Sequence, residues 1–415
     1  MIYSAYKTWH DLAAPARWMA GLAAETLRQI EIGDLYLPMA PVAAAACEMM
    51  EDVALTHQRP AWDFGPVEAG EPEIRILEET VLETPFASLV RFRRSLQRVG
   101  LPKVLVVAPI SGHFATLLRP TIQRLLGEHD VYVTDWKNAR DVPVSAGRFG
   151  VDEHIDHLLQ FLRAMGPGTH LFAVCQPCPA AIAATALLAE DADPATPASL
   201  ILMAGPVDAR INPTAVSAFA AERPLDWFER CLISRAPLGV AGYRRKVYPG
   251  FVQIAAFMSM NLERHVSQHM DLFRALVRGE DSRADPIRTF YDEYYAVSDL
   301  TAEFFLETVD KVFQRFLLAK GELDWRGRRV DPSVIERTPL LTIEGERDDI
   351  CSPGQTRAAH DLLSGLPDGM KRHHLQAGAG HYGVFSGSRW REGVYPELRR
   401  FIAEHDQHTR WRSVS

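Results

Sequence analysis

Short apolar runs alternate with helical segments in the middle of the chain, and this alternation constrains the fold more than any other feature. Each run lacks the polar alternation of a half-exposed strand, as expected of a strand buried on both faces. Such a β-α-β-α-β order predicts an α/β fold with a doubly wound, mostly parallel sheet and right-handed crossovers. The runs are VLVVAP (104–109), VYVTDW (131–136), HLFAV (170–174) and LILMAG (200–205).

The alternation then stops and resumes only at PLLTIEG (339–345). The residues between contain aromatic-rich, helix-like segments, which predict a large helical cap inserted late in the sheet, over the carboxyl ends of its strands. The start of the chain is rich in Ala, Met and Leu and predicts helices. The predicted division is a helical N-terminal segment (1–60), an α/β core (61–206 and 336–415) and a helical cap (207–335).

Composition excludes several classes of protein. The formal charge of −8 disfavours a nucleic-acid-binding protein, which normally carries a basic face. No run of about 18 apolar residues is present, so we expect no membrane span. The first residues lack a basic segment followed by a clean apolar one, and the five cysteines are sparse and odd in number. We therefore expect a cytoplasmic protein with reduced thiols.

Cys175 follows directly on one of the predicted strands and is followed by a predicted helix. This is the context of a nucleophile elbow, a sharp turn that lifts a side chain above the edge of the sheet. The helix N-terminus there favours a thiolate. The glycines that usually flank such a nucleophile are replaced by Ala173 and Pro177. No G-x-S-x-G occurs in the chain, so no serine fits the position better; the alternative is a buried structural cysteine.

Two further residues could complete a catalytic triad with Cys175. Asp348 lies just beyond a predicted strand, in GERDDICSPG, where Asp349 is a rival, and His381 lies among glycines in GAGHYG. A carboxylate in such a loop can orient a histidine, which then acts as the base. The order nucleophile, acid, histidine is that of α/β-hydrolases. Each signal is weak alone, but together they predict a Cys–His–Asp triad.

An oxyanion hole is expected beside this triad. The backbone N–H of the residue after the nucleophile, Gln176, usually supplies one donor, and a loop after a neighbouring strand supplies the second. That loop contains PISGHF (109–114), from which we choose Ser111. The alternative for Ser111 is an ordinary strand-to-helix turn.

Cys175 and Cys178 also form a C-x-x-C motif, again between a strand and a helix. A thiol-disulfide redox site has this context. That reading leaves Asp348, His381 and the long cap without a role. A zinc site is weaker still, because no second Cys or His pair has suitable spacing. We expect no metal and no cofactor.

The sequence resembles the intracellular poly(3-hydroxybutyrate), or polyhydroxyalkanoate, depolymerases of the α/β-hydrolase superfamily. The likeness runs through almost the whole chain. It implies hydrolysis of a stored polyester, with Cys175 as nucleophile, Asp348 as orienting acid and His381 as base. It rests on the stretches VLVVAPISGHFATLLRP, DVYVTDWKNARDVP, AVCQP, LLTIEGERDDICSPGQT and GAGHYGVFSGSRW.

The resemblance also implies a partner, the surface of a storage granule in the cytoplasm. The helical N-terminus, with Trp9 and Trp18, could touch such a granule or a second subunit of a homo-oligomer. Two other activities remain open: a polyhydroxyalkanoate synthase-like acyltransferase, and a thiolytic depolymerase that uses a thiol as acceptor. Synthases usually carry G-x-C-x-G, where this chain has A-V-C-Q-P. A granule-binding protein with a decayed site is disfavoured by the intact triad.

Overall fold

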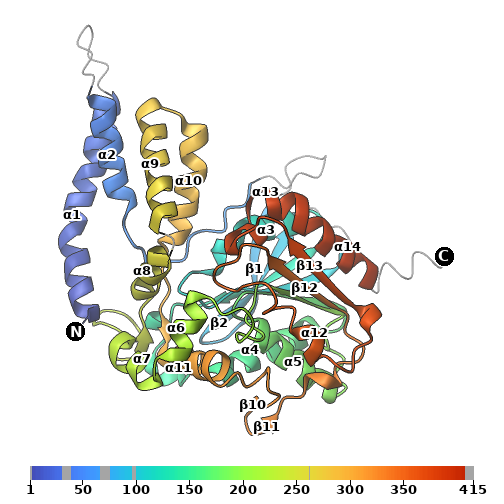
Figure 1. Cartoon of the computed structure of the whole chain (residues 1–415). Helices are drawn as coiled ribbons and strands as arrows, with labels where there is room; N and C mark the ends of the chain where they lie inside the picture. The colour runs from blue at the N-terminus through green and yellow to red at the C-terminus, as the bar shows by residue number, and fades with distance from the viewer. Residues whose placement is uncertain (1, 30–38, 66–74, 96–99, 261, 407–415) are drawn as a thin grey trace.

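An eight-stranded sheet lies at the centre of the computed structural model, which describes residues 2–29, 39–65, 75–95, 100–260 and 262–406 (Figure 1). Its strands are β1 (Ile76–Glu83), β2 (Ala87–Arg94), β3 (Lys103–Val107), β4 (Asp130–Trp136), β5 (Thr169–Val174), β6 (Ser199–Met203), β12 (Leu340–Gly345) and β13 (Lys371–Gln376). They are ordered β1-β2-β4-β3-β5-β6-β12-β13. All neighbours from β4 to β13 are parallel, whereas β2 is antiparallel to both β1 and β4. The predicted doubly wound, mostly parallel sheet is confirmed.

Helices cover both faces of this sheet. On one face lie α3 (Arg119–Leu125) and α14 (Tyr395–His405), and on the other lie α4 (Val151–Met165) and α5 (Cys178–Glu190) (Figure 1). The central strands β5 and β6 are buried along their whole length, which explains their continuous apolar sequences. Helix α5 is buried from Cys178 to Leu188, because its small alanines let it pack closely between the sheet and its neighbours.

The segment between β6 and β12 contains helices and several short strands. Its small strands were not predicted, because two- and three-residue strands leave no periodic signal in the sequence. The helices are α6 (Ala215–Glu222), α7 (Leu225–Leu232), α8 (Gly250–Met260), α9 (Leu262–Arg278), α10 (Asp281–Tyr294) and α11 (Ala302–Thr308). The strands are β7 (Ser234–Arg235), β8 (Lys246–Tyr248) and β9 (Leu300–Thr301), which form one sheet, and the hairpin β10 (Asp324–Trp325) and β11 (Arg328–Arg329).

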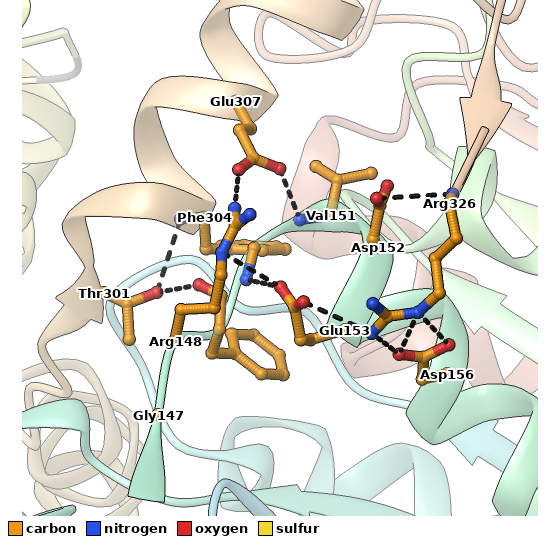
Figure 2. Close-up of polar contacts among 12 residues, drawn as sticks. Gly147, Arg148, Val151, Asp152, Glu153, Asp156, Thr301, Phe304, Glu307 and Arg326 are labelled. Carbon is orange, nitrogen blue, oxygen red and sulfur yellow. Dashed lines mark hydrogen bonds and ion pairs between the residues drawn. The ribbon is translucent and has the colours of Figure 1, made fainter. Parts of the chain in front are cut away.

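Polar contacts join this inserted segment to the beginning of α4 (Figure 2). Glu307 of α11 accepts a hydrogen bond of 2.9 Å from the backbone N–H of Val151 and also pairs with Arg148. In the turn between β10 and β11, Arg326 pairs with Asp156 of α4, its Nε lying 3.1 Å from Oδ2. The insert is thus fixed to the sheet domain at the N-terminus of a helix that packs on the sheet.

The first two helices, α1 (Ile2–Gln29) and α2 (Ala40–Asp52), form a hairpin that stands beside α9 and α10 (Figure 1). An apolar cluster joins them, in which Ala45 of α2 packs with Leu272 and Leu276 of α9 and Ala284 of α10. The predicted N-terminal segment and the predicted cap therefore share one packed core. Their division at residues 60, 206 and 335 stays a prediction. No described helix is both long enough and apolar enough to cross a membrane.

A buried carboxylate anchors the start of α1. The Tyr3 hydroxyl donates a hydrogen bond of 2.6 Å to Oδ2 of Asp299 and accepts one of 3.1 Å from Arg140. The other oxygen of Asp299 accepts the backbone N–H of Gly250, the first residue of α8, at 2.9 Å. Burial raises the pKa of Asp299 to about 6, despite these donors. One side chain thus holds the beginnings of α1 and α8 together.

We predict that Glu307→Ala lowers the free energy of unfolding by about 1–2 kcal/mol, because the Val151 N–H loses its acceptor at a helix N-terminus. Glu307→Gln keeps an acceptor oxygen and should cost clearly less, since the partly exposed pair with Arg148 contributes little. Urea denaturation of both variants checks this. Equal losses in the two variants would contradict the capping role.

Candidate active site

Cys175 occupies a sharp turn between β5 and α5. Its φ of +65° lies in the left-handed region, which L-residues other than Asn and Asp rarely adopt. The Cys175 N–H donates to the Met203 carbonyl at 2.7 Å, and the Cys175 carbonyl accepts the N–H of Cys178 at 3.1 Å. Backbone strain of this kind persists only where the surrounding structure over-determines it. The tight strand-to-helix turn predicted for this cysteine is present.

The close packing at the turn depends on a glycine in another strand. A Cβ added to Gly205, just after β6, would lie 2.6 Å from the Cys175 carbonyl oxygen and closer still to Sγ of Cys178. The Thr356 hydroxyl fixes Gly205 through hydrogen bonds of 2.9 and 3.0 Å to its N–H and its carbonyl. Gly205 thus provides space beside the turn, although Ala173 and Pro177 occupy the usual glycine positions. Gly205 was not predicted from the sequence to have a role at the site.

Asp348 and His381 form a buried hydrogen-bonded pair. Oδ2 of Asp348 lies 2.8 Å from Nδ1 of His381, and both side chains are almost fully buried. Oδ1 of Asp348 accepts the backbone N–H groups of Ile350 and Cys351 at 2.9 and 2.8 Å. These two amides fix the carboxylate, so that its other oxygen faces the imidazole. The rival, Asp349, is exposed.

The electrostatics of the site favour a protonated histidine. Burial lowers the pKa of His381, but the negative charge of the Asp348 carboxylate, and negative charge on Cys175, have the opposite effect and dominate, so that the pKa lies well above its usual range. The hydrogen bonds of the imidazole to Asp348 and to Cys175 act in the same direction. The structure therefore brings the three predicted side chains together, in an arrangement suited to a thiolate–imidazolium pair.

The two residues chosen for the oxyanion hole lie where expected in the fold. Gln176 follows Cys175 directly, before α5, and Ser111 lies in the turn after β3, the strand that pairs with β5. In this turn Gly112 has a φ of +84°, and its carbonyl accepts the N–H of Ser298 at 2.8 Å. Their role as donors stays a prediction.

Two residues near these groups were not predicted from the sequence. Gln253 of α8 packs against Gly112, where a Cβ would lie 2.8 Å from its amide oxygen. Tyr382 follows His381, and burial raises its pKa well above the usual range, with further contributions from Tyr294 and Cys175. The sequence holds no signal for Gln253, because its place depends on how the inserted segment folds back. Tyr382 could have been predicted as a site residue, because it directly follows the candidate base His381.

The Cys178 side chain is buried in the protein beneath the turn. Its Sγ lies 3.5 Å from the Ala173 carbonyl and 3.8 Å from that of Met203, and the residue is fully buried. Burial, and secondarily Cys175, raises the pKa of its thiol far above the usual range. These contacts give Cys178 a packing role under the turn and leave little support for a redox pair.

Parts of the chain are similar in sequence to known proteins. Residues 204–406, just under half of the chain, match the family model described as PHB de-polymerase C-terminus. A poly(3-hydroxyalkanoate) polymerase subunit of Haloferax mediterranei is 27% identical over 109 residues, which are 26% of this chain and 21% of that protein. The alignment therefore spans about a fifth of that relative's length.

Several solved structures match the chain at low sequence identity and with TM-scores below 0.5. An epoxide hydrolase of Bacillus megaterium is 13% identical, with 77% of this chain and 99% of that one covered and a TM-score of 0.47. An esterase of Thermogutta terrifontis is 15% identical, with coverages of 80% and 100% and a TM-score of 0.41. A monoacylglycerol lipase of Paleococcus ferrophilus is 15% identical, with coverages of 74% and 96% and a TM-score of 0.44.

The strand order, the strained turn after β5 and the acid–histidine pair on the loops after β12 and β13 define the class. The protein is an α/β-hydrolase. Within this class, residues 204–406 are similar to the C-terminal part of the poly(3-hydroxybutyrate) depolymerases.

We predict that Asp348→Asn lowers the pKa of His381, because the carboxylate that stabilises the imidazolium is lost. An NMR titration of the His381 ring protons measures the change. Asp349→Asn, at the exposed neighbouring position, is the matched control and should leave the titration unchanged. A larger shift in the Asp349 variant would mean that the acid has been misassigned.

We also predict that Cys178→Ala keeps the full activity of the wild-type protein and loses about 1 kcal/mol of stability, as expected for one buried atom. Inactivation by a mild oxidant should proceed equally in both proteins. A variant that resists oxidation, while the wild type loses activity reversibly with dithiothreitol, would restore the redox-pair interpretation.

Proposed function

We propose that this protein hydrolyses ester bonds of intracellular poly(3-hydroxybutyrate) or a related polyhydroxyalkanoate and releases 3-hydroxyalkanoate monomers or oligomers. The observation that supports this most is the buried Asp348–His381 pair beside Cys175, in a fold whose C-terminal half matches the depolymerase model. We propose the cytoplasmic surface of a storage granule as its place of action.

The first half of the reaction forms an acyl-enzyme. The Cys175 thiolate attacks the carbonyl carbon of an ester in the polymer, and the resulting oxyanion accepts hydrogen bonds from the backbone N–H groups of Gln176 and the Ser111 loop. Loss of one such donor typically raises a barrier by roughly 3–4 kcal/mol. The C–O ester bond then breaks, and His381 gives its proton to the departing 3-hydroxyl group. A thioester remains on Cys175.

The second half releases the product. Water attacks the thioester carbonyl while His381 takes one of its protons, and Asp348 stabilises the imidazolium that forms. The tetrahedral intermediate expels the Cys175 thiolate, which leaves a free carboxylic acid and the enzyme in its starting state. Each turnover therefore consumes one ester bond and one water molecule, and the protein supplies every catalytic group.

Acyl transfer to a hydroxyl or a thiol is the second candidate. Its support is the polymerase subunit among the relatives and the use of a cysteine, whose thioester can be taken by several acceptors. The residues around Cys175 are those of neither the synthase G-x-C-x-G pattern nor the serine elbow. The identity of the acceptor therefore has to be measured.

We expect Cys175→Ala to abolish the release of 3-hydroxybutyrate from amorphous granules, with a loss of at least about 1,000-fold, because the covalent step has no nucleophile. Cys231→Ala, at an exposed cysteine of α7, is the control and should match the wild type.

Product analysis with and without coenzyme A identifies the acceptor. Free acid in both reactions supports hydrolysis, 3-hydroxybutyryl-coenzyme A supports thiolysis, and growth of added oligomers supports polymerisation. Full turnover by the Cys175→Ala protein would overturn the assignment of the nucleophile.

A further inference from the structure

The exposed apolar side chains of the protein gather on the helices beside the sheet domain. Thirteen of the twenty exposed large apolar residues in the described part of the chain lie on α1, on or next to α2, or at the α8–α9 junction and along α9. Figure 1 shows that these helices stand apart from the central sheet. A concentration of this kind marks a surface that contacts something else.

Helix α1 carries the most prominent of these residues. Trp9 is 65% exposed and Leu12 is 76% exposed, and Ile2, Met19 and Leu22 are exposed on the same side. At about 100° per residue these five positions fall within about 160° of the helix circumference. We call them the α1 face.

The α1 face contains no charge. Its sector otherwise holds Ala, Ser, Thr, Pro and Leu residues, and every charged residue of α1 projects from the remaining sector. The buried residues of the helix, among them Tyr3 and Ala24, lie outside the centre of the face, so that it points to solvent. A charge-free face of this width is broader than the narrow seam by which two helices pair in a coiled coil.

The orientation of this face is fixed relative to the candidate active site. Tyr3 at the base of α1 is bonded to Asp299, which also holds the first residue of α8. Further along α8, Gln253 packs on Gly112, next to the proposed oxyanion loop. A particle bound to α1 would therefore be linked to the candidate active site through two packed contacts, one at Asp299 and one at Gly112.

We propose that the α1 face adsorbs to the surface of a solid, uncharged polyester particle and so presents the catalytic centre to its substrate. This inference rests on the proposed function. An aliphatic polyester carries no charge, and neither does the α1 face, so that their contact takes no charged group out of water. Helices that lie on anionic lipid surfaces present Lys and Arg to the lipid beside their apolar face, whereas on α1 Lys7 pairs with Asp11 and Arg28 pairs with Glu48.

The test replaces Trp9→Gln, Leu12→Gln and Met19→Gln together in the full-length protein, since glutamine keeps helix propensity and adds no charge. The matched control is Val144→Gln, Leu238→Gln and Leu375→Gln, three exposed apolar residues outside these helices. Three quantities are measured for each protein: the fraction that sediments with amorphous poly(3-hydroxybutyrate) particles, the rate on the particles, and the rate on a soluble trimer of 3-hydroxybutyrate.

We expect the α1 variant to lose at least about 10-fold in adsorption and in the rate on particles, because three large apolar side chains no longer leave water. The rate on the trimer should be unchanged, which also shows that the variant is folded. The control should behave as the wild type. If the wild type cleaves neither particles nor trimer, the proposed function itself fails.

Three results would overturn the docking proposal while leaving hydrolysis intact. In the first, the α1 variant adsorbs to particles as well as the wild type does. In the second, light scattering shows a wild-type dimer that the α1 substitutions dissociate, with adsorption unaffected, so that a second copy covers the face. In the third, the wild type sediments more strongly with phosphatidylglycerol vesicles than with polyester particles.

Discussion

The chain passes from β5 into α5 within three residues, and it can do so only because Cys175 adopts a left-handed backbone conformation. This turn determines where the cysteine side chain can lie and directs Cys178 into the core. The strain is held by the hydrogen bond from the Cys175 N–H to Met203 and by the burial of the following helix. The remaining parts of the site have to be placed relative to this one residue.

The loops after β12 and β13 place the acid and the base. Because β12 and β13 are parallel neighbours and β12 also pairs with β6, the loops that follow them end on the same edge of the sheet as Cys175. The amides of Ile350 and Cys351 hold Asp348 before any substrate arrives, so that little rearrangement is needed as the imidazolium forms.

The sequence predicted the parts of the structure that depend on local pattern. The buried strands have unbroken apolar runs, and Cys175 and Asp348 each follow such a run. His381 was predicted from its glycine-rich loop, because the preceding strand β13, KRHHLQ, has no apolar run and was not predicted. The choice between Asp348 and Asp349 depends on the direction in which one loop leaves its strand, which no periodicity encodes. The inward direction of Cys178 follows from the dihedral angles of the turn. The packing of α2 on α9 joins segments more than 200 residues apart, so that local pattern carries no trace of it.

Gly205 shows that a glycine distant in sequence from the nucleophile can provide the space that a tight turn needs. The space that a glycine beside the nucleophile normally provides is supplied here from the neighbouring strand, where a Cβ would overlap the backbone of the turn. The requirement is therefore for free space between two neighbouring strands, and a five-residue sequence motif around the nucleophile is not the only way to meet it. Enzymes that satisfy it in this way escape a search by linear motif, and mutations at the two places should be epistatic, because each residue tolerates only what the other leaves room for.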